Sequence, residues 1–231
     1  MAFGGRHGSE KYRLLPTTYK SHTNFRFADH TASCHRFTAS CFSLFLMAIL
    51  QIPNWCEAPE ELFAVDGHCG LLATWLALAA HGKTISVPEL INACRHTKRH
   101  GVFTVSLATA LTQWGLTVSF HTDPDLEIGG FERKCYARAR RSGVLPQPAL
   151  TLEQLLNERR RGRLPIVLFN TDSDEAHFSP LLGKRRGKLL LPLSQHGNMS
   201  DQEFLMRWSA PGILRQCVTI KEYPRRNRHN R

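Results

Sequence analysis

One run of apolar and small residues, Leu71–Ala80, stands out in the hydrophobic pattern of the chain. It carries no charged side chain and is apolar on every side of a helical projection, which is typical of a buried central helix. The turn-forming sequence Asp66-Gly67-His68 precedes it, and Gly82 follows it. We therefore expect a helix that begins at Cys69, ends near Gly82 and is the most buried helix of its domain.

Helical patterns come first along the remaining chain, and strand patterns follow. Ser86–Glu89 has the form of a capping box with proline in the first turn, and it predicts a helix to about Cys94. Further helices are expected over 104–114, 131–141, 151–163 and 200–208, and strands over 49–52, 116–121, 165–169 and 217–220. We interpret 177–182 and 188–193 as a hairpin that turns at 183–187, and 143–148 as a loop. This order predicts an α+β fold.

The first 46 residues differ in composition from the rest. They contain six Lys or Arg, two acidic residues and many Ser and Thr, and no helical or strand period persists. A transit peptide has a similar composition, and His30, Cys34 and His35 could be metal ligands but lack a fourth partner. The simpler hypothesis is that Met47 is the true start. We therefore expect a disordered or mis-assigned extension (1–46), one domain (47–223) and a basic tail (224–231).

The charge of the chain is strongly basic, with 30 Lys and Arg against 19 Asp and Glu and a net charge of +11. Such a balance is found in proteins that bind nucleic acid or anionic membranes. The basic residues are scattered, however, without interleaved aromatic residues or zinc-finger spacing, so we expect no nucleic-acid partner. No apolar run is long enough to cross a bilayer. The seven cysteines form no C-x-x-C pair, which favours a reducing, cytoplasmic compartment over a disulfide framework.

Cys69 and His177 are the candidate catalytic residues. At the first turn of a helix, free N–H groups and the helix dipole favour a thiolate, so we expect a lowered pKa for Cys69. His177 follows a polar turn and opens a strand, from which its ring could share the thiol proton. The alternatives are a buried structural cysteine and a histidine in a surface turn. The pattern requires no cofactor or metal.

The order of these motifs resembles the papain-like cysteine peptidases of the double-glycine leader, bacteriocin-processing type. The resemblance spans about Ile49 to Ile220, and its motifs are Asp66–Gly70 before the apolar helix, Ser86–Leu90, Gly101–Thr104, Gly115-Leu116, Pro165–Val167, Ala176–Phe178, Gly183 and Gln202–Trp208. It implies a papain-like α+β fold, in which a helical half with Cys69 at the N-terminus of its central helix packs on an antiparallel sheet. It also implies that Cys69 is the nucleophile and His177 the base.

The chain departs from the family at two positions. Leu191 stands where the family has the aspartate that orients the histidine, and a leucine side chain cannot accept the imidazole N–H. Ser194, Gln195 or Asn198 could replace that aspartate from nearby. Phe63 stands where the family has its oxyanion glutamine, six residues before the cysteine. Gln51 or the main-chain N–H of Cys69 could supply a donor instead.

The resemblance implies a cysteine peptidase (thiol protease) that hydrolyses a peptide or amide bond. The alternative is a catalytically impaired papain-like domain that binds a peptide or protein partner in the same groove. The hypothesis of a nucleic-acid-binding domain has only the basic charge of the chain to support it. The family usually sits on an ABC exporter, and this chain has neither a membrane span nor a P-loop. We therefore expect a peptide or protein substrate and action alone or with a separate transporter or partner protein.

Overall fold

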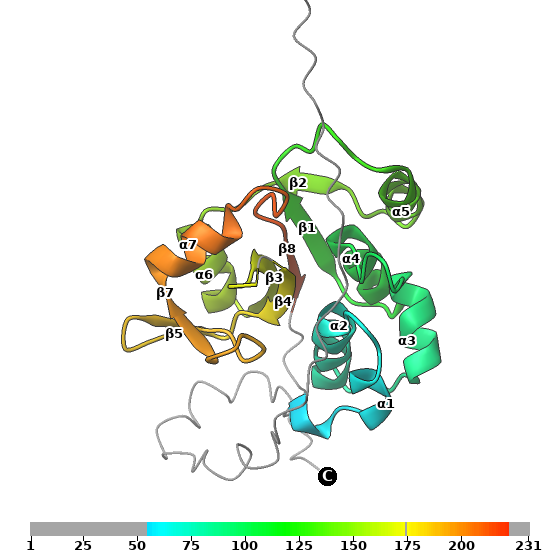
Figure 1. Cartoon of the computed structure of the whole chain (residues 1–231), viewed down its shortest axis with the longest axis horizontal. Coiled ribbons are helices and arrows are strands. Elements are labelled where there is room, and N and C mark those ends of the chain that lie inside the picture. Colours follow the sequence, from blue (N-terminus) through cyan, green and yellow to red (C-terminus); the bar gives the residue numbers. More distant parts are fainter. Residues whose placement is uncertain (1–54, 174, 222–231) are drawn as a thin grey trace, which may run out of the picture. The chain divides into compact units, whose positions relative to one another are not determined.

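The computed structural model describes residues 55–173 and 175–221 (Figure 1). The extension 1–46 and the tail 224–231 lie outside the described residues, as do Met47, Gln51, the predicted strand 49–52, and the triplet His30, Cys34 and His35. The domain boundaries expected from the sequence therefore stay predictions. None of the helices within the described ranges is long and apolar enough to cross a membrane.

The first half of the described chain is helical. Its elements are a 3₁₀ turn (Trp55–Glu57), α1 (Glu60–Phe63), α2 (Cys69–Ala80), α3 (Val87–Cys94), α4 (Thr104–Gln113) and α5 (Gly130–Arg141). The central helix begins at Cys69, as the sequence predicted. Nine of the 12 residues of α2 are buried, but so are eight of the ten in α4, so the expectation that α2 is the most buried helix is wrong. The reason is position, because α4 packs against α2, α3, α5 and β1.

The helix starts follow the capping signals in the sequence. The hydroxyl of Ser86 accepts from the Glu89 main-chain N–H, and the Glu89 carboxylate accepts from the Ser86 N–H. Thr151 and Gln154 make the same reciprocal pair at the start of α6 (Leu152–Arg160). Ser200 caps α7 (Asp201–Trp208). Each cap satisfies N–H groups that the first turn of a helix leaves without partners, which explains why these starts were predictable.

A five-stranded sheet forms the centre of the domain. Its order is β2-β1-β8-β3-β4, made of β2 (Pro146–Pro148), β1 (Val118–Thr122), β8 (Cys217–Lys221), β3 (Arg163–Asn170) and β4 (Ala176–Pro180). All neighbours are antiparallel except β1 and β2. The prediction of a loop over 143–148 is wrong for its last three residues, because Pro146–Pro148 pairs with Phe120–Thr122 as an edge strand. Proline is tolerated there because an edge strand needs hydrogen bonds on one side only.

The expected hairpin over 177–193 is also wrong in its pairing. β4 pairs with β3, where His177 lies opposite Phe169. β5 (Gly183–Arg185), β6 (Lys188–Leu190) and β7 (Asn198–Ser200) form a separate three-stranded sheet. The turn is tighter than expected, with Arg186 and Gly187 alone at its tip and φ values of 51° and 79°. Two residues at positive φ are typical of the turns that join twisted antiparallel strands.

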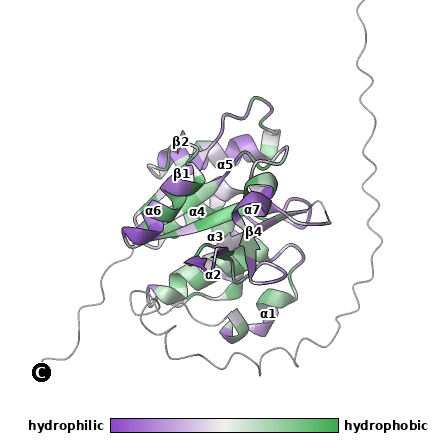
Figure 2. Ribbon diagram, turned by 90° about the vertical axis from the view of Figure 1, so that its left-hand side faces the viewer, coloured by the Kyte–Doolittle hydropathy of each residue, from purple (hydrophilic) through white to green (hydrophobic). Residues whose placement is uncertain are grey.

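Helices cover both faces of the five-stranded sheet. α2 packs against β4 and α4 against β1, while α6 and α7 pack against β3, and Figure 1 shows these two pairs on opposite sides of the strands. Six consecutive residues of β3, Leu164–Phe169, are buried, which requires cover on both faces. The central strands are coloured as hydrophobic in Figure 2. The predicted α+β fold, with Cys69 at the start of a central helix packed on a largely antiparallel sheet, is therefore confirmed.

Candidate active site

The turn before α2 sets the position of Cys69. Gly67 has a φ of 67°, a conformation that side chains with a Cβ rarely adopt. Nδ1 of His68 lies 3.0 Å from the Val65 carbonyl oxygen, and Nε2 of His96 lies 2.8 Å from the Asp66 carbonyl oxygen. A carbonyl only accepts, so both rings donate. These bonds hold the main chain that leads into the first turn of α2.

Gly70, the residue after the cysteine, allows α2 to lie close to β4. A Cβ at this position would be 2.8 Å from Cβ of Val102 and 3.1 Å from Cδ2 of Phe178. The first of these distances is shorter than a van der Waals contact, and Val102 is a buried, stiff, β-branched residue. The glycine is therefore a packing requirement that brings the start of the helix to the strand that carries His177.

The sulfur of Cys69 lies against the main chain around His177. Sγ is 4.0 Å from the carbonyl oxygen of Ala176, and the N–H of Phe178 also acts on the thiol. The residues before and after His177 therefore both face the sulfur. Within residues 55–173 and 175–221, no hydrogen bond joins Sγ to the imidazole itself. The fold brings together the two segments that the sequence singled out, across 108 positions of the chain.

Burial raises the pKa of the Cys69 thiol. The main-chain N–H groups of Phe178, Gly70 and Cys69 oppose this shift, and the negative charge of Glu175 adds to it. The expected lowering of this pKa is therefore wrong. The sulfur sits half-buried between α2 and β4, and the loss of water around a thiolate there outweighs the favourable helix N-terminus.

Burial lowers the pKa of His177, and the neighbouring His68 lowers it further. The hydrogen bond to Leu193 and the charge of Glu175 act in the opposite direction. Both shifts favour the neutral forms, a protonated thiol and an uncharged imidazole. This differs from the thiolate that the sequence led us to expect.

Nε2 of His177 lies 2.6 Å from the main-chain carbonyl oxygen of Leu193. Because the carbonyl only accepts, Nε2 carries the proton, and Nδ1 of the neutral ring is left as the proton acceptor. The ring also makes an edge-on contact with Phe169, at 5.6 Å between centroids. These two contacts limit how the imidazole is oriented.

The side chains considered as substitutes for the missing aspartate do not orient His177. The hydroxyl of Ser194 donates to the Leu191 carbonyl and the amide of Asn198 to the His196 carbonyl, while Gln195 is exposed. Leu191 is fully buried in the core. Sequence reasoning missed Leu193 because the contact uses its main chain, for which residue identity carries no signal.

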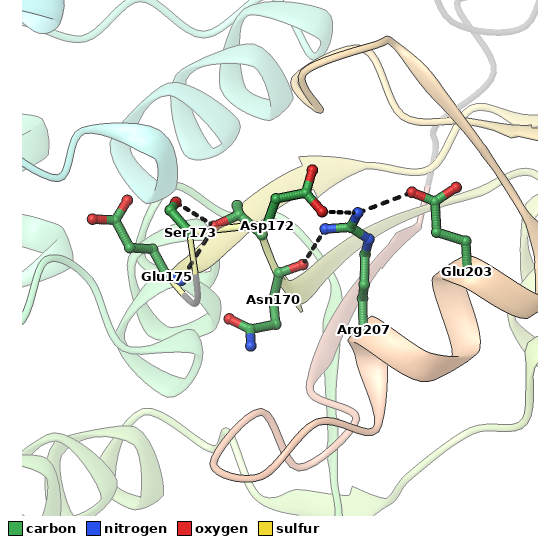
Figure 3. Close-up of polar contacts among 7 residues, drawn as sticks. Asn170, Asp172, Ser173, Glu175, Glu203 and Arg207 are labelled. Carbon is green, nitrogen blue, oxygen red and sulfur yellow. Dashed lines mark hydrogen bonds and ion pairs between the residues drawn. The ribbon is translucent and has the colours of Figure 1, made fainter. Parts of the chain in front are cut away.

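The segment between β3 and β4 is held from both ends (Figure 3). The Thr171 N–H donates to the Glu175 carbonyl at 2.9 Å, and the Thr171 hydroxyl accepts from the Glu175 N–H at 3.2 Å. On the other side, Arg207 of α7 pairs with Asp172 and Glu203 and donates to the Asn170 carbonyl. Glu175, the residue directly before β4, is therefore held by two hydrogen bonds to Thr171, the residue directly after β3.

The position of the family's oxyanion glutamine is occupied by an apolar ring. Phe63 packs edge-on against Trp55 and His68, at 6.3 Å and 5.7 Å between ring centroids. A phenyl ring cannot donate a hydrogen bond to an oxyanion. Gln51, the side chain considered in its place, lies outside the described residues.

No family model matches the chain, and no curated protein matches its sequence. The solved structures that are similar to it include the following two. One is a double glycine motif protease from an AMS/PCAT transporter, in complex with its leader peptide, with 15% identity over 67% of this chain and 84% of that chain and a TM-score of 0.40. The other is the peptidase domain of Streptococcus ComA, a bifunctional ABC transporter involved in quorum sensing, with 12% identity over 67% and 91% and a TM-score of 0.41.

Proposed function

We propose that this domain is a cysteine peptidase-like hydrolase, with Cys69 as nucleophile and His177 as base, acting on a peptide or amide bond. The observation that carries the proposal is the hydrogen bond from His177 Nε2 to Leu193 O, since it leaves Nδ1 as a proton acceptor. The sulfur of Cys69 lies beside the main chain on either side of that histidine. A thiol and a base held at one site are the minimum for acyl transfer.

The pKa shifts support a mechanism that starts from neutral groups. The sulfur attacks the substrate carbonyl carbon while its proton moves to Nδ1 of His177. The carbonyl oxygen becomes an oxyanion, for which the N–H of Cys69 is one donor. The imidazolium returns the proton to the leaving amine as the C–N bond breaks, and a thioester remains. Water, which His177 deprotonates, then attacks the thioester to release a carboxylic acid and the thiol.

The second candidate function is a papain-like domain that binds a peptide or protein partner without cleaving it. Phe63 favours this alternative, because it removes the side-chain donor of the oxyanion site. The loss of one such donor costs on the order of a hundredfold to a thousandfold in rate. The substrate or partner is in either case a peptide or protein. We propose that the domain acts in the cytoplasm, alone or with a separate transporter.

The test is hydrolysis of a quenched-fluorescent peptide library, including Gly-Gly sites, by the purified full chain. We expect cleavage by the wild type, none by Cys69→Ala, and a loss of about a hundredfold or more in His177→Ala. His81→Ala is the control, because His81 bonds its own helix at the far end of α2, with Nδ1 at 2.7 Å from the Ala77 carbonyl oxygen. If the wild type binds peptides but cleaves none, and Cys69→Ala binds equally well, the binding function replaces the peptidase.

A further inference from the structure

Two side chains of β4 reach the same residue of the segment after β6. Nε2 of His177 donates to the Leu193 carbonyl at 2.6 Å, and the Leu193 N–H donates to the hydroxyl of Ser179 at 3.1 Å. His177 and Ser179 are two positions apart on a strand, so their side chains leave the same face. Leu193 is therefore held through both its N–H and its carbonyl by one face of β4.

Leu193 lies in a turn, and among the described residues it belongs to none of the paired strands. The neighbouring main-chain bonds of this turn, from the Ser194 N–H to Leu191 and from the Gly197 N–H to Ser194, do not involve Leu193. Ser179 is fully buried, and its own hydroxyl proton is directed at the Pro180 carbonyl at 3.1 Å. Its lone pairs are thus available to the Leu193 N–H.

We propose that Ser179 is a positioning residue, whose hydroxyl sets the Leu193 main chain so that its carbonyl holds the proton of His177 on Nε2. The inference rests on the proposed function for its catalytic consequence. A carbonyl carries no net charge, so it orients the ring with less electrostatic attraction than a carboxylate supplies. Its effect on the histidine therefore depends on geometry, which Ser179 provides.

The test reads the hydrogen bond directly, by nuclear magnetic resonance of the His177 ring in the ¹⁵N-labelled full chain. In the wild type we expect the neutral ring to be protonated on Nε2, with that proton protected from exchange. In Ser179→Ala we expect at least tenfold faster exchange of this proton and a mixture of both tautomers. We also expect a titration midpoint for His177 below the wild-type value, because the bond to Leu193 favours the charged ring.

Two further variants control the experiment. Ser194→Ala removes a hydroxyl bond of the same turn, from Ser194 Oγ to the Leu191 carbonyl at 2.7 Å, and is expected to leave the His177 signals unchanged. Ser179→Thr keeps the hydroxyl and is expected to retain the wild-type tautomer. If Ser179→Ala does not fold, Ser179→Cys replaces it, since sulfur is a poor acceptor of nearly the same shape.

The positioning role of Ser179 and the peptidase activity of the domain are tested by separate measurements. Unchanged exchange, tautomer and midpoint in folded Ser179→Ala or Ser179→Cys would overturn the positioning role, whatever the activity. Cleavage by the wild type that is lost in Cys69→Ala would still support the peptidase function. If both hold, Ser179→Ala should lower the cleavage rate by about tenfold, a part of the hundredfold or more that a positioned base contributes.

Discussion

The main-chain carbonyl of Leu193 accepts a hydrogen bond from Nε2 of His177 at 2.6 Å. In the family that the sequence resembles, an aspartate side chain orients the histidine. Here the residue matching that aspartate, Leu191, is buried in the core. The carbonyl that faces the ring instead is that of Leu193, in the turn that follows. A carbonyl fixes the tautomer but adds no negative charge. The imidazolium is therefore stabilised less here than beside a carboxylate.

Cys69 should be alkylated faster than any of the fully buried cysteines, Cys94, Cys135 and Cys217. Burial raises the pKa of Cys94 to about 12 and also raises that of Cys217, whereas Cys69 is half-buried and lies against the main chain around His177. Replacing His177 by Ala should slow the reaction at Cys69 because the proton acceptor is lost. The measurement is the iodoacetamide rate at each cysteine, read by mass spectrometry.

The exposed Cys56 is the internal control of that experiment, because its rate should be the same in the wild type and in His177→Ala. If Cys69 reacts no faster than Cys94 or Cys135, and His177→Ala changes nothing, the two residues do not act as a pair.

The pH profile of Cys69 alkylation should differ from that of a preformed ion pair. Burial raises the pKa of the thiol, so the rate should keep rising with pH through and above the ordinary cysteine range. A thiolate–imidazolium pair would instead give a rate that levels off below pH 7. The measurement is the rate from pH 5 to 10, and a plateau on the acid side of neutrality would contradict the neutral resting state.

The stability of the fold should fall as the pH drops through the ordinary histidine range. Burial lowers the pKa of His121, so the unfolded chain binds a proton that the folded chain excludes, and stability is present above the unfolded pKa and lost below it. His121→Gln keeps a donor for the Pro148 carbonyl but removes the titration. Urea unfolding at pH 7.5 and 5.5 should show a smaller loss in the variant. An equal loss would mean that other groups set the acid sensitivity.

Leu191→Asp should destabilise the domain and fail to supply an orienting carboxylate. The side chain is fully buried, and an unpaired carboxylate there costs on the order of 3 kcal/mol or more. Leu205→Asp is the matched control, because Leu205 is 41% exposed on α7. Urea unfolding should show a large loss for the first variant only. A stable Leu191→Asp with faster hydrolysis would show that the aspartate role can be restored.

Gly70→Ala should destabilise the fold by about 1–3 kcal/mol and slow the chemistry of Cys69, because its Cβ would push α2 away from Val102 and β4. Gly130→Ala is the control, since a Cβ at that helical position meets nothing within 4 Å. Its stability should be unchanged or slightly raised. Thermal unfolding and the alkylation rate of Cys69 together check the prediction. Equal behaviour of the two variants would show that the approach of α2 to β4 is not tight.

Local signals in the sequence determined the helices of this protein. The capping boxes at Ser86 and Thr151 and the apolar run after Cys69 specify element starts through contacts within four residues, and each start was predicted correctly. The order of elements was enough to predict the α+β class. Cys69 and His177 also stood out, because their residue types and flanking turns are local properties.

The tertiary structure decided the partners of these elements. The sequence of 177–193 fits a hairpin, but pairing β4 with β3 lets β4 lie within reach of α2 and buries Phe178, a gain that no local pattern reports. The pKa directions of Cys69 and His177 depend on how much water the packed elements exclude. The group that orients His177 is a main-chain carbonyl, which every residue possesses. The packing of a turn onto β4 decides that this carbonyl is the one of Leu193. Long-range packing, and not residue type, sets where a carbonyl points.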